Sequence, residues 1–552
     1  MHICRMKFLS LSSVILLLFS CQFSKTEVDA IYYNGNINTL NDSLPTATCM
    51  IIKNKKIIDI GSDELLNKYK VKNNKTDLFD LKKQTVYPGF IDAHCHFYGY
   101  AKTSLSCQLT GTKSWEEIIN KLDSFSEQTS SAWLTGRGWD QNDWSIKKYP
   151  TNDKLNQKFP DRPVILKRVD GHAAICNQKA LTLAGIDANT KIQGGEILLD
   201  KGKLTGVLID NAVDLVEKIV IKPSQNDVIK ALQNTEKECF SKGLTTLADA
   251  GLDLNECLFI DSLGKINSLS IYTYLMLNPN DASFQFAKNK GILENDNTKI
   301  CSFKLYGDGS LGSRGAKLKQ DYCDQKNHNG LMIYSQDFYL KTCQWIKNNT
   351  KYQVNTHCIG DSANRFILDV YSQCLTKNND ERWRIEHAQV VDPKDMVLFQ
   401  QYNVIPSVQP THATSDGPWA EERLCKHRLN GAYAYKSLLK TNQYLPLGTD
   451  FPVEYIDPLY TYYSAVYRQS ATSPMDSPFL INESLSPIEA IKGMTIWAAK
   501  ACKLEHRKGS LAKGMDADFI VLNQDLLSCK QEQVLNTKIV MTVSSGKLVF
   551  KI

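Results

Sequence analysis

The chain has 552 residues, of which 42% are hydrophobic and 22% charged, and its formal net charge is +6 at pH 7. This length far exceeds one average domain, and the composition is that of a folded globular protein rather than a disordered one. Because the net charge is small and Lys and Arg are mixed with Asp and Glu, we expect no nucleic-acid-binding surface.

The first 21 residues have the layout of a signal peptide. Arg5 and Lys7 precede an apolar stretch, residues 14–19, which is too short to span a membrane. The stretch leads into Cys21 within Leu-Phe-Ser-Cys, which resembles a bacterial lipoprotein box; an ordinary cleaved secretion signal is the alternative. No later run is long and apolar enough to span a bilayer. We therefore expect an exported protein, in the periplasm or held at a cell-envelope membrane through lipid on Cys21.

Sixteen cysteines would allow disulfides in an exported protein. They are spread along the chain without paired or regular spacing. We therefore expect mostly buried thiols and no disulfide framework.

Both ends of the chain beyond the signal are rich in strand-forming segments. Residues 29–87 alternate short β-rich runs with Asn and Gly turns, which predicts a small β domain. Residues 505–552 repeat this pattern.

Between these ends, residues 88–500 alternate strand-like and helix-like segments, which predicts a parallel sheet with crossover helices. Eight such units form a TIM (β/α)8 barrel, an α/β fold. The gap after the first strand is too long for one crossover, so residues from about 100 to 240 are expected to form an inserted lobe. The eight predicted strands are residues 88–94, 243–251, 270–277, 301–308, 352–358, 383–389, 403–410 and 444–450.

The first predicted strand ends in two histidines. In a strand, His94 and His96 project to the same face while Cys95 points away. Two converging imidazoles suit a divalent cation that takes nitrogen ligands, although the triplet alone is as compatible with two polar residues at a strand exit. Active sites of TIM barrels lie at the C-terminal ends of the strands, so candidates at later strand ends should meet these histidines. Those candidates are Lys304, His357, His387 and Asp450.

Together these features resemble the metal-dependent amidohydrolases, in particular the branch of YtcJ-like and N-substituted formamide deformylase-like enzymes. The resemblance extends from about residue 29 to residue 552. Its most specific stretches include PGFIDAHCHF, KLYGDGSLGSRGA, THCIGDSANRFILD, RIEHAQVV, SVQPTHATSD and LGTDFPVE. The resemblance implies that the two strand-rich chain ends pair into one β-sandwich beside the barrel.

The metal ligands expected on this basis are His94, His96, Lys304, His357, His387 and Asp450. The cation would activate water and polarise a carbonyl group, and Asp450 is the candidate to take the proton of that water and deliver it to the leaving nitrogen.

Lys304 decides how many metal ions we expect. A protonated lysine cannot be a ligand, but in similar enzymes a lysine on the fourth strand is carboxylated and bridges two metals. Without that modification, a single ion held by His94, His96 and Asp450 with help from His357 or His387 remains workable. We favour two ions, and zinc over manganese or iron.

Three further residues are candidate substrate contacts. His172, in the predicted insertion, either caps the next helix or reaches the metal as a substrate contact and second catalytic residue. Arg314 lies in the Gly-rich loop after Lys304, which either shapes the pocket or only forms turns. His412 follows the seventh strand, where it either contacts substrate or has no role.

The leading hypothesis is a metal-dependent hydrolase that cleaves a non-peptide carbon–nitrogen bond in a small N-acyl, N-formyl or cyclic amide. Two alternatives stay open: a metal-dependent hydrolase of esters, lactones or carbamates, and a lipid-anchored binding protein without catalysis. The sequence leaves the substrate and the oligomeric state open, with a homodimer as one option.

Overall fold

The computed structural model describes residues 26–70, 76–129, 131–168, 172–193, 195–221, 223–473 and 475–552. The predicted signal peptide and Cys21 lie outside the described residues. Within those ranges, no helix combines the length and the apolar character needed to cross a bilayer.

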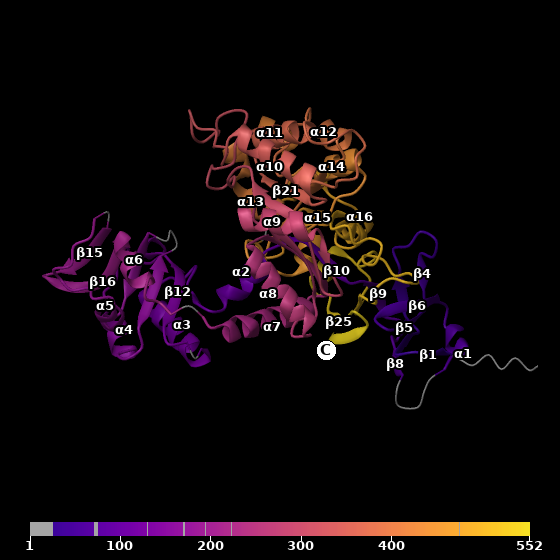
Figure 1. The fold of residues 1–552 in the computed structure, drawn as a ribbon, viewed down its shortest axis with the longest axis horizontal. Coiled ribbons are helices and arrows are strands. Elements are labelled where there is room, and N and C mark those ends of the chain that lie inside the picture. The colour runs from indigo at the N-terminus through magenta and orange to yellow at the C-terminus, as the bar shows by residue number, and fades with distance from the viewer. Residues whose placement is uncertain are drawn as a thin grey trace, which may run out of the picture.

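The centre of the molecule is a parallel sheet whose strands follow one another in chain order (Figure 1). Seven of the eight predicted barrel strands are present, and nearly every residue in them is buried, as expected for strands covered on both faces. They are β10 (Phe90–Cys95), β17 (Leu244–Leu252), β18 (Tyr272–Leu277), β20 (Thr298–Tyr306), β21 (Gln353–Cys358), β22 (Arg384–His387) and β23 (Ile405–Ser407).

The eighth predicted strand, residues 444–450, is irregular, although it closes the barrel between β23 and β10. On one side the Gly448 N–H donates to the Val408 carbonyl (3.0 Å), and on the other the Asp450 N–H donates to the His94 carbonyl (2.8 Å). A Cβ atom at Gly448 would lie 2.6 Å from the backbone nitrogen of His94, so only glycine fits there. Asp450 has a left-handed φ of 63°, which ends the extended run. The prediction was therefore right about the position of this segment and wrong about its regularity.

Helices cover the outside of the barrel, and local sequence fixes where they begin. In α7 (Gln225–Ser241), the Ser224 side chain accepts from the Asp227 N–H while the Asp227 carboxylate accepts from the Ser224 N–H, which forms a capping box. The other main helices are α2 (Phe97–Thr103), α8 (Leu254–Lys265), α9 (Asp281–Lys290), α10 (Gln336–Asn349), α11 (Asp361–Ser372), α12 (Met396–Gln401), α13 (Pro410–Leu424), α14 (Tyr435–Asn442), α15 (Pro458–Tyr467), α16 (Pro487–Gly493) and α17 (Ile496–Ala501).

The segment between α2 and α7 forms a separate six-stranded sheet in the order β11-β12-β13-β14-β16-β15, which lies to the left of the barrel in Figure 1. Trp139 and Trp144 are buried in its hydrophobic cluster. Its strands are β11 (Cys107–Gln108), β12 (Leu134–Trp139), β13 (Val164–Arg168), β14 (Ala173–Cys176), β15 (Gly195–Asp200) and β16 (Lys203–Asp210), with helices α3 (Trp115–Gln128), α4 (Asp153–Lys158), α5 (Gln178–Leu183) and α6 (Asn211–Glu217).

The two chain ends share a sheet in the order β26-β25-β24-β9-β3-β4, in which β9 from the N-terminal part pairs antiparallel with β24 from the C-terminal part. A four-stranded sheet, β6-β5-β2-β8, packs on it: the rings of Tyr32 and Phe519 are 4.7 Å apart within one hydrophobic cluster. The strands are β2 (Ala30–Tyr33), β3 (Asn36–Asn38), β4 (Thr46–Ala47), β5 (Cys49–Lys53), β6 (Lys56–Gly61), β8 (Asp77–Asp80), β9 (Thr85–Pro88), β24 (Phe519–Leu522), β25 (Ile539–Ser544) and β26 (Lys547–Lys551).

One disulfide is present, although we expected mostly buried thiols and no disulfide framework. Cys323, in the loop after β20, is bonded to Cys425 at the end of α13, and the two are 102 residues apart in sequence. The other cysteines within the described ranges are free, and most of them are buried. The pair was missed because the fold alone brings the two distant segments together.

Candidate metal centre

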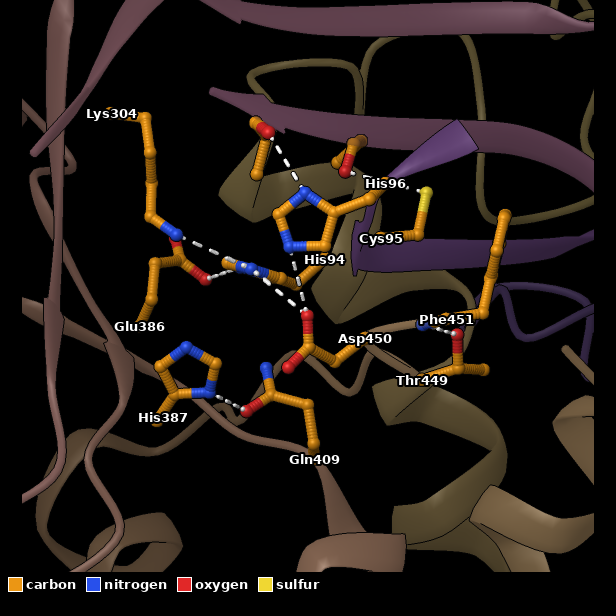
Figure 2. A network of polar contacts seen from close by, with 12 residues as sticks. His94, Cys95, His96, Lys304, Glu386, His387, Gln409, Thr449, Asp450 and Phe451 are labelled. Carbon is orange, nitrogen blue, oxygen red and sulfur yellow. Dashed lines mark hydrogen bonds and ion pairs between the residues drawn. The ribbon is translucent and has the colours of Figure 1, made fainter. Parts of the chain in front are cut away.

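Side chains from the C-terminal ends of several barrel segments meet at one point (Figure 2). His94 and His96, at the end of β10, both direct Nε2 toward Oδ1 of Asp450, at 3.6 and 3.1 Å. The two imidazoles therefore face one position, as their i, i+2 spacing predicts. The three side chains form one group of donor atoms close enough to hold a metal ion.

Asp450 also belongs to a second group, with His387 and His412. Its Oδ2 lies 3.1 Å from Nε2 of His412, whereas its Oδ1 faces His94 and His96. One carboxylate thus lies between two sets of imidazoles. His412, which the sequence indicated only as a substrate contact, is a candidate ligand in this geometry.

Two other predicted ligands, His357 and Lys304, belong to neither group. Both line a cavity beside these groups. The ring of His357 is 4.5 Å from the ring of His387, and its buried Nε2 has no hydrogen-bond partner among the described residues. Lys304 places Nζ 3.5 Å from Nε2 of His94, and burial lowers the pKa of its amino group. A lysine with a lowered pKa is more easily neutral, which is the form that reacts with carbon dioxide.

Hydrogen bonds at Nδ1 orient three of the imidazoles. Nδ1 of His94 lies 2.6 Å from the carboxylate of Glu386, Nδ1 of His96 lies 3.0 Å from the carbonyl of Ala250, and Nδ1 of His387 lies 2.7 Å from the amide oxygen of Gln409. Oxygen atoms of these kinds only accept, so each Nδ1 carries the proton and each neutral ring presents a lone pair at Nε2.

This arrangement fits a divalent cation. Nε2 of His96 and Oδ1 of Asp450 are two acceptors only 3.1 Å apart, which is unfavourable unless a proton or a cation lies between them. Burial lowers the pKa of His94 to about 4 and that of His357 to about 3, so both rings are neutral at pH 7. Burial opposes ionisation of Asp450, but the His412 imidazole beside its Oδ2 holds the pKa of this carboxyl well below the usual range. Neutral imidazoles and one carboxylate are typical ligands of zinc and related metals.

A buried ion pair lies beneath the two histidines of β10. Glu386 bonds to His94 and, through its other oxygen, to Nε of Arg384 at 2.6 Å. Arg384 extends across the barrel interior and donates to the Ala93 carbonyl on β10 (2.6 Å) and to Oγ of Ser407 on β23 (3.0 Å). Burial raises the pKa of Glu386, but Arg384 and His94 outweigh it and lower that pKa to about 2. Glu386 is therefore an anion that holds His94 in place.

Sequence reasoning missed Glu386 and Gln409, although signals for both were present. Glu386 and Arg384 alternate on β22, so they share one face, and Gln409 lies two residues after the end of β23, at the barrel mouth. His387 has a left-handed φ of 74°, so the strand alternation stops there and His387 reaches the same cavity as the rest of the site. Backbone of this kind is strained and gathers at functional sites.

The structure does not bring His172 or Arg314 to this cluster. His172 lies at the start of β14, where Nδ1 is 2.9 Å from Asp210 and the side chain is 76% exposed. Arg314 turns toward Asp324, at 2.7 Å. Neither residue lines the cavity beside the metal centre.

That cavity has a volume of about 340 Å³ and opens at the barrel mouth. Beyond the candidate ligands its wall combines apolar and polar side chains, so it has room for a small organic molecule beside the metal centre. These other side chains include Tyr306, Leu311, Ile359, Gln389, Asp416, Trp419 and Glu454.

Comparison with known proteins adds to this geometry. A model of the amidohydrolase family matches residues 77–550. The chain is 31% identical to YtcJ of Bacillus subtilis strain 168 over 529 residues, covering 95% of this chain and 99% of that protein. It is 23% identical to N-substituted formamide deformylase of Arthrobacter pascens, covering 94% of this chain and 98% of that enzyme. The crystal structure of an uncharacterized metal-dependent hydrolase from Pyrococcus horikoshii OT3 matches with a TM-score of 0.75 at 25% identity, covering 91% of this chain and 99% of that one.

Proposed function

This chain belongs to the amidohydrolase family, in the branch of YtcJ and N-substituted formamide deformylase, and from that premise we propose that it hydrolyses a non-peptide carbon–nitrogen bond. The substrate would be a small N-acyl, N-formyl or cyclic amide. The observation that carries this proposal is the convergence of His94, His96, His387 and His412 on Asp450 beside a cavity of about 340 Å³.

The two groups that share Asp450 would hold the metal. His94 and His96 form one set, and His387 and His412 form the other. When bound there, a divalent cation supplies Lewis acidity, which polarises the amide carbonyl and makes water more acidic. Glu386 and Gln409 contribute by fixing the tautomer and orientation of His94 and His387.

Asp450 is the proposed proton carrier. Among the residues that the structure describes, it is the carboxylate shared by both sets of imidazoles, so it is placed to take a proton from water at a carboxylate oxygen. The same oxygen can then return the proton to the leaving nitrogen, which leaves poorly as an anion. Where no ion is held by His387 and His412, Nε2 of His412, 3.1 Å from Oδ2, would orient this carboxylate.

We further propose zinc as the metal, and two ions if Lys304 is carboxylated. The support is the ligand type and the position of Lys304, buried and 3.5 Å from His94. Carboxylation would convert the Lys304 side chain, which repels a cation when protonated, into an anion that could bind metal. Without it, His357 would complete a mononuclear site around His94, His96 and Asp450.

We also propose that the protein is exported and attached to a cell-envelope membrane through Cys21. The support for both proposals is the signal-like layout of residues 1–21. We propose as well that the segment between α2 and α7 is an inserted lobe.

A substrate panel with the metal-loaded and chelator-treated protein tests the proposed activity. It should contain N-formyl, N-acetyl and cyclic amides together with matched esters, lactones and carbamates. We expect amide hydrolysis that is lost on metal removal and restored by zinc. Activity that survives complete metal removal would contradict the proposal, and turnover restricted to esters or lactones would replace it.

A further inference from the structure

The cavity beside the metal centre has an acidic wall that the proposed proton transfer does not use. Helix α13 presents His412, Asp416 and Trp419 to the cavity, at positions i, i+4 and i+7 of one helix face. His412 contacts Asp450, so Asp416 lies one helical turn, about 5.4 Å, farther along the wall. A substrate bound at the metal centre would therefore have Asp416 about one helical turn away.

Neutral donors hold the Asp416 carboxylate in a fixed orientation. Its Oδ2 accepts from Nε2 of Gln389 (2.9 Å) and from the hydroxyl of Tyr433 (2.8 Å), and Gln389 also donates to that hydroxyl (2.9 Å). Both partners are buried. Among the residues that the structure describes, no Lys or Arg forms an ion pair with Asp416. Burial raises the pKa of its carboxyl, and the positive charge of His412 offsets this effect only in part.

Gln389 adds an acceptor oxygen to the same wall of the cavity. The side chain is 4% exposed and lines the cavity. Because its amide nitrogen faces the Asp416 carboxylate, the orientation of the amide is fixed and its oxygen is left over. Within the described part of the chain, no donor bonds to this oxygen. The oxygen itself is not buried, so it is open to the cavity and can accept from a donor of a ligand there.

We propose that Asp416 and Gln389 bind a protonated amine of the substrate, about one helical turn from the bond that is cleaved. This inference rests on the hydrolase function proposed above and narrows its substrate class to N-acyl derivatives of compounds that carry a second, basic nitrogen. An ammonium group has three donors and no acceptor, which matches a carboxylate beside a carbonyl oxygen. The apolar side chains of Leu311, Ile359 and Trp419 line the same cavity and suit the carbon chain between the two nitrogens.

Two probes of equal length test the inference: N-(4-aminobutyl)acetamide and N-pentylacetamide, in which a methyl group replaces the ammonium group. With the metal-loaded wild type, we expect a kcat/KM at least about tenfold higher for the cationic probe, the scale of a hydrogen-bonded charge. Asp416→Asn should bring the ratio of the two values close to one. Asp337→Asn removes a carboxylate from an exposed position on α10 and should leave the ratio at the wild-type value.

Binding of the same probes to wild type and Asp416→Asn, measured by ligand-detected NMR, separates this inference from the proposed function. Preferential binding of the cationic probe without hydrolysis of either one would contradict the proposed function and support the inference. Hydrolysis of both at equal kcat/KM would overturn the inference and leave the function intact.

Metal content gives a further decisive readout. If Asp416→Asn loses one equivalent of metal, Asp416 is a metal ligand and the inference is wrong. If that variant does not fold, Gln389→Met tests the same wall, because it removes the unpaired oxygen while Tyr433 still donates to Asp416. An unchanged preference for the cationic probe in Gln389→Met would also overturn the inference.

Discussion

Oε2 of Glu386 lies 2.6 Å from Nδ1 of His94, although 292 residues separate the two in sequence. This hydrogen bond connects the buried Arg384–Glu386 pair inside the barrel to the first candidate metal ligand at its mouth. Glu386 therefore holds His94 in position without being a candidate metal ligand itself.

Glu386→Gln should weaken metal binding, because the His94 imidazole loses the carboxylate that orients it. Loss of the carboxylate that orients a metal-binding histidine typically costs about 10- to 100-fold in affinity. Zinc titration of the chelator-treated variant would measure this. Because Arg384 is left buried without its counter-ion, we also expect a lower melting temperature. Glu532→Gln, at an exposed position, is the control and should change neither quantity.

Asp450→Asn should lower kcat by about 10²- to 10⁴-fold, the usual contribution of a group that transfers protons. Turnover must be normalised to bound metal measured on the same sample, because Asp450 belongs to both ligand groups. A variant that keeps near-wild-type turnover per metal ion would show that another residue carries the proton.

Carboxylation of Lys304 can be tested by mass. Native mass spectrometry of the metal-loaded protein should show the added mass of one carbon dioxide, lost on acidification, and peptide mapping under mild conditions should place it at Lys304. Lys304→Ala should then bind one metal ion where the wild type binds two. Equal metal stoichiometry in both proteins would support a mononuclear site.

Gly448→Ala should displace the backbone segment that carries Asp450 and so disturb the metal centre. The new Cβ would lie 2.6 Å from the nitrogen and 2.8 Å from the carbonyl oxygen of His94, so the segment that carries Asp450 must move away from β10. We expect reduced metal affinity together with a lower melting temperature. Gly61→Ala is the matched control, since its nearest contact would be an ordinary 3.7 Å; a Gly448→Ala variant as stable as this control would contradict the argument.

The disulfide between Cys323 and Cys425 should stabilise the wall of the cavity. It joins the loop after β20, which contributes Leu311 and Gly312 to the cavity, to α13, which contributes His412 and Trp419. In the chain-entropy model a closed loop of this length contributes about 4–5 kcal/mol to stability. Thermal unfolding of Cys323→Ser should therefore show a clear loss of stability, whereas Cys529→Ser, which alters a free cysteine, should not. Equal melting temperatures would mean that the pair is not oxidised in the purified protein.

The sequence determined the architecture and most of the candidate ligands of this protein. Strand-like segments that alternate with helix-like ones predicted seven barrel strands in their correct order, because a buried parallel strand is an apolar run that can be recognised locally. His94 and His96 could be paired from their spacing alone, since alternation in a strand is a local property. The later candidates followed because strand ends of a barrel share one face.

Only the tertiary structure decided which polar groups meet. The orientation of His94 depends on Glu386, 292 residues away, and the second candidate metal group depends on His412, which no local pattern distinguished from a loop histidine. The same reason explains the missed disulfide and the placement of His172 and Arg314 away from the metal centre. Residue type and spacing show what a side chain is able to do, but long-range packing fixes its neighbours, and those neighbours determine its charge, its orientation and its partner.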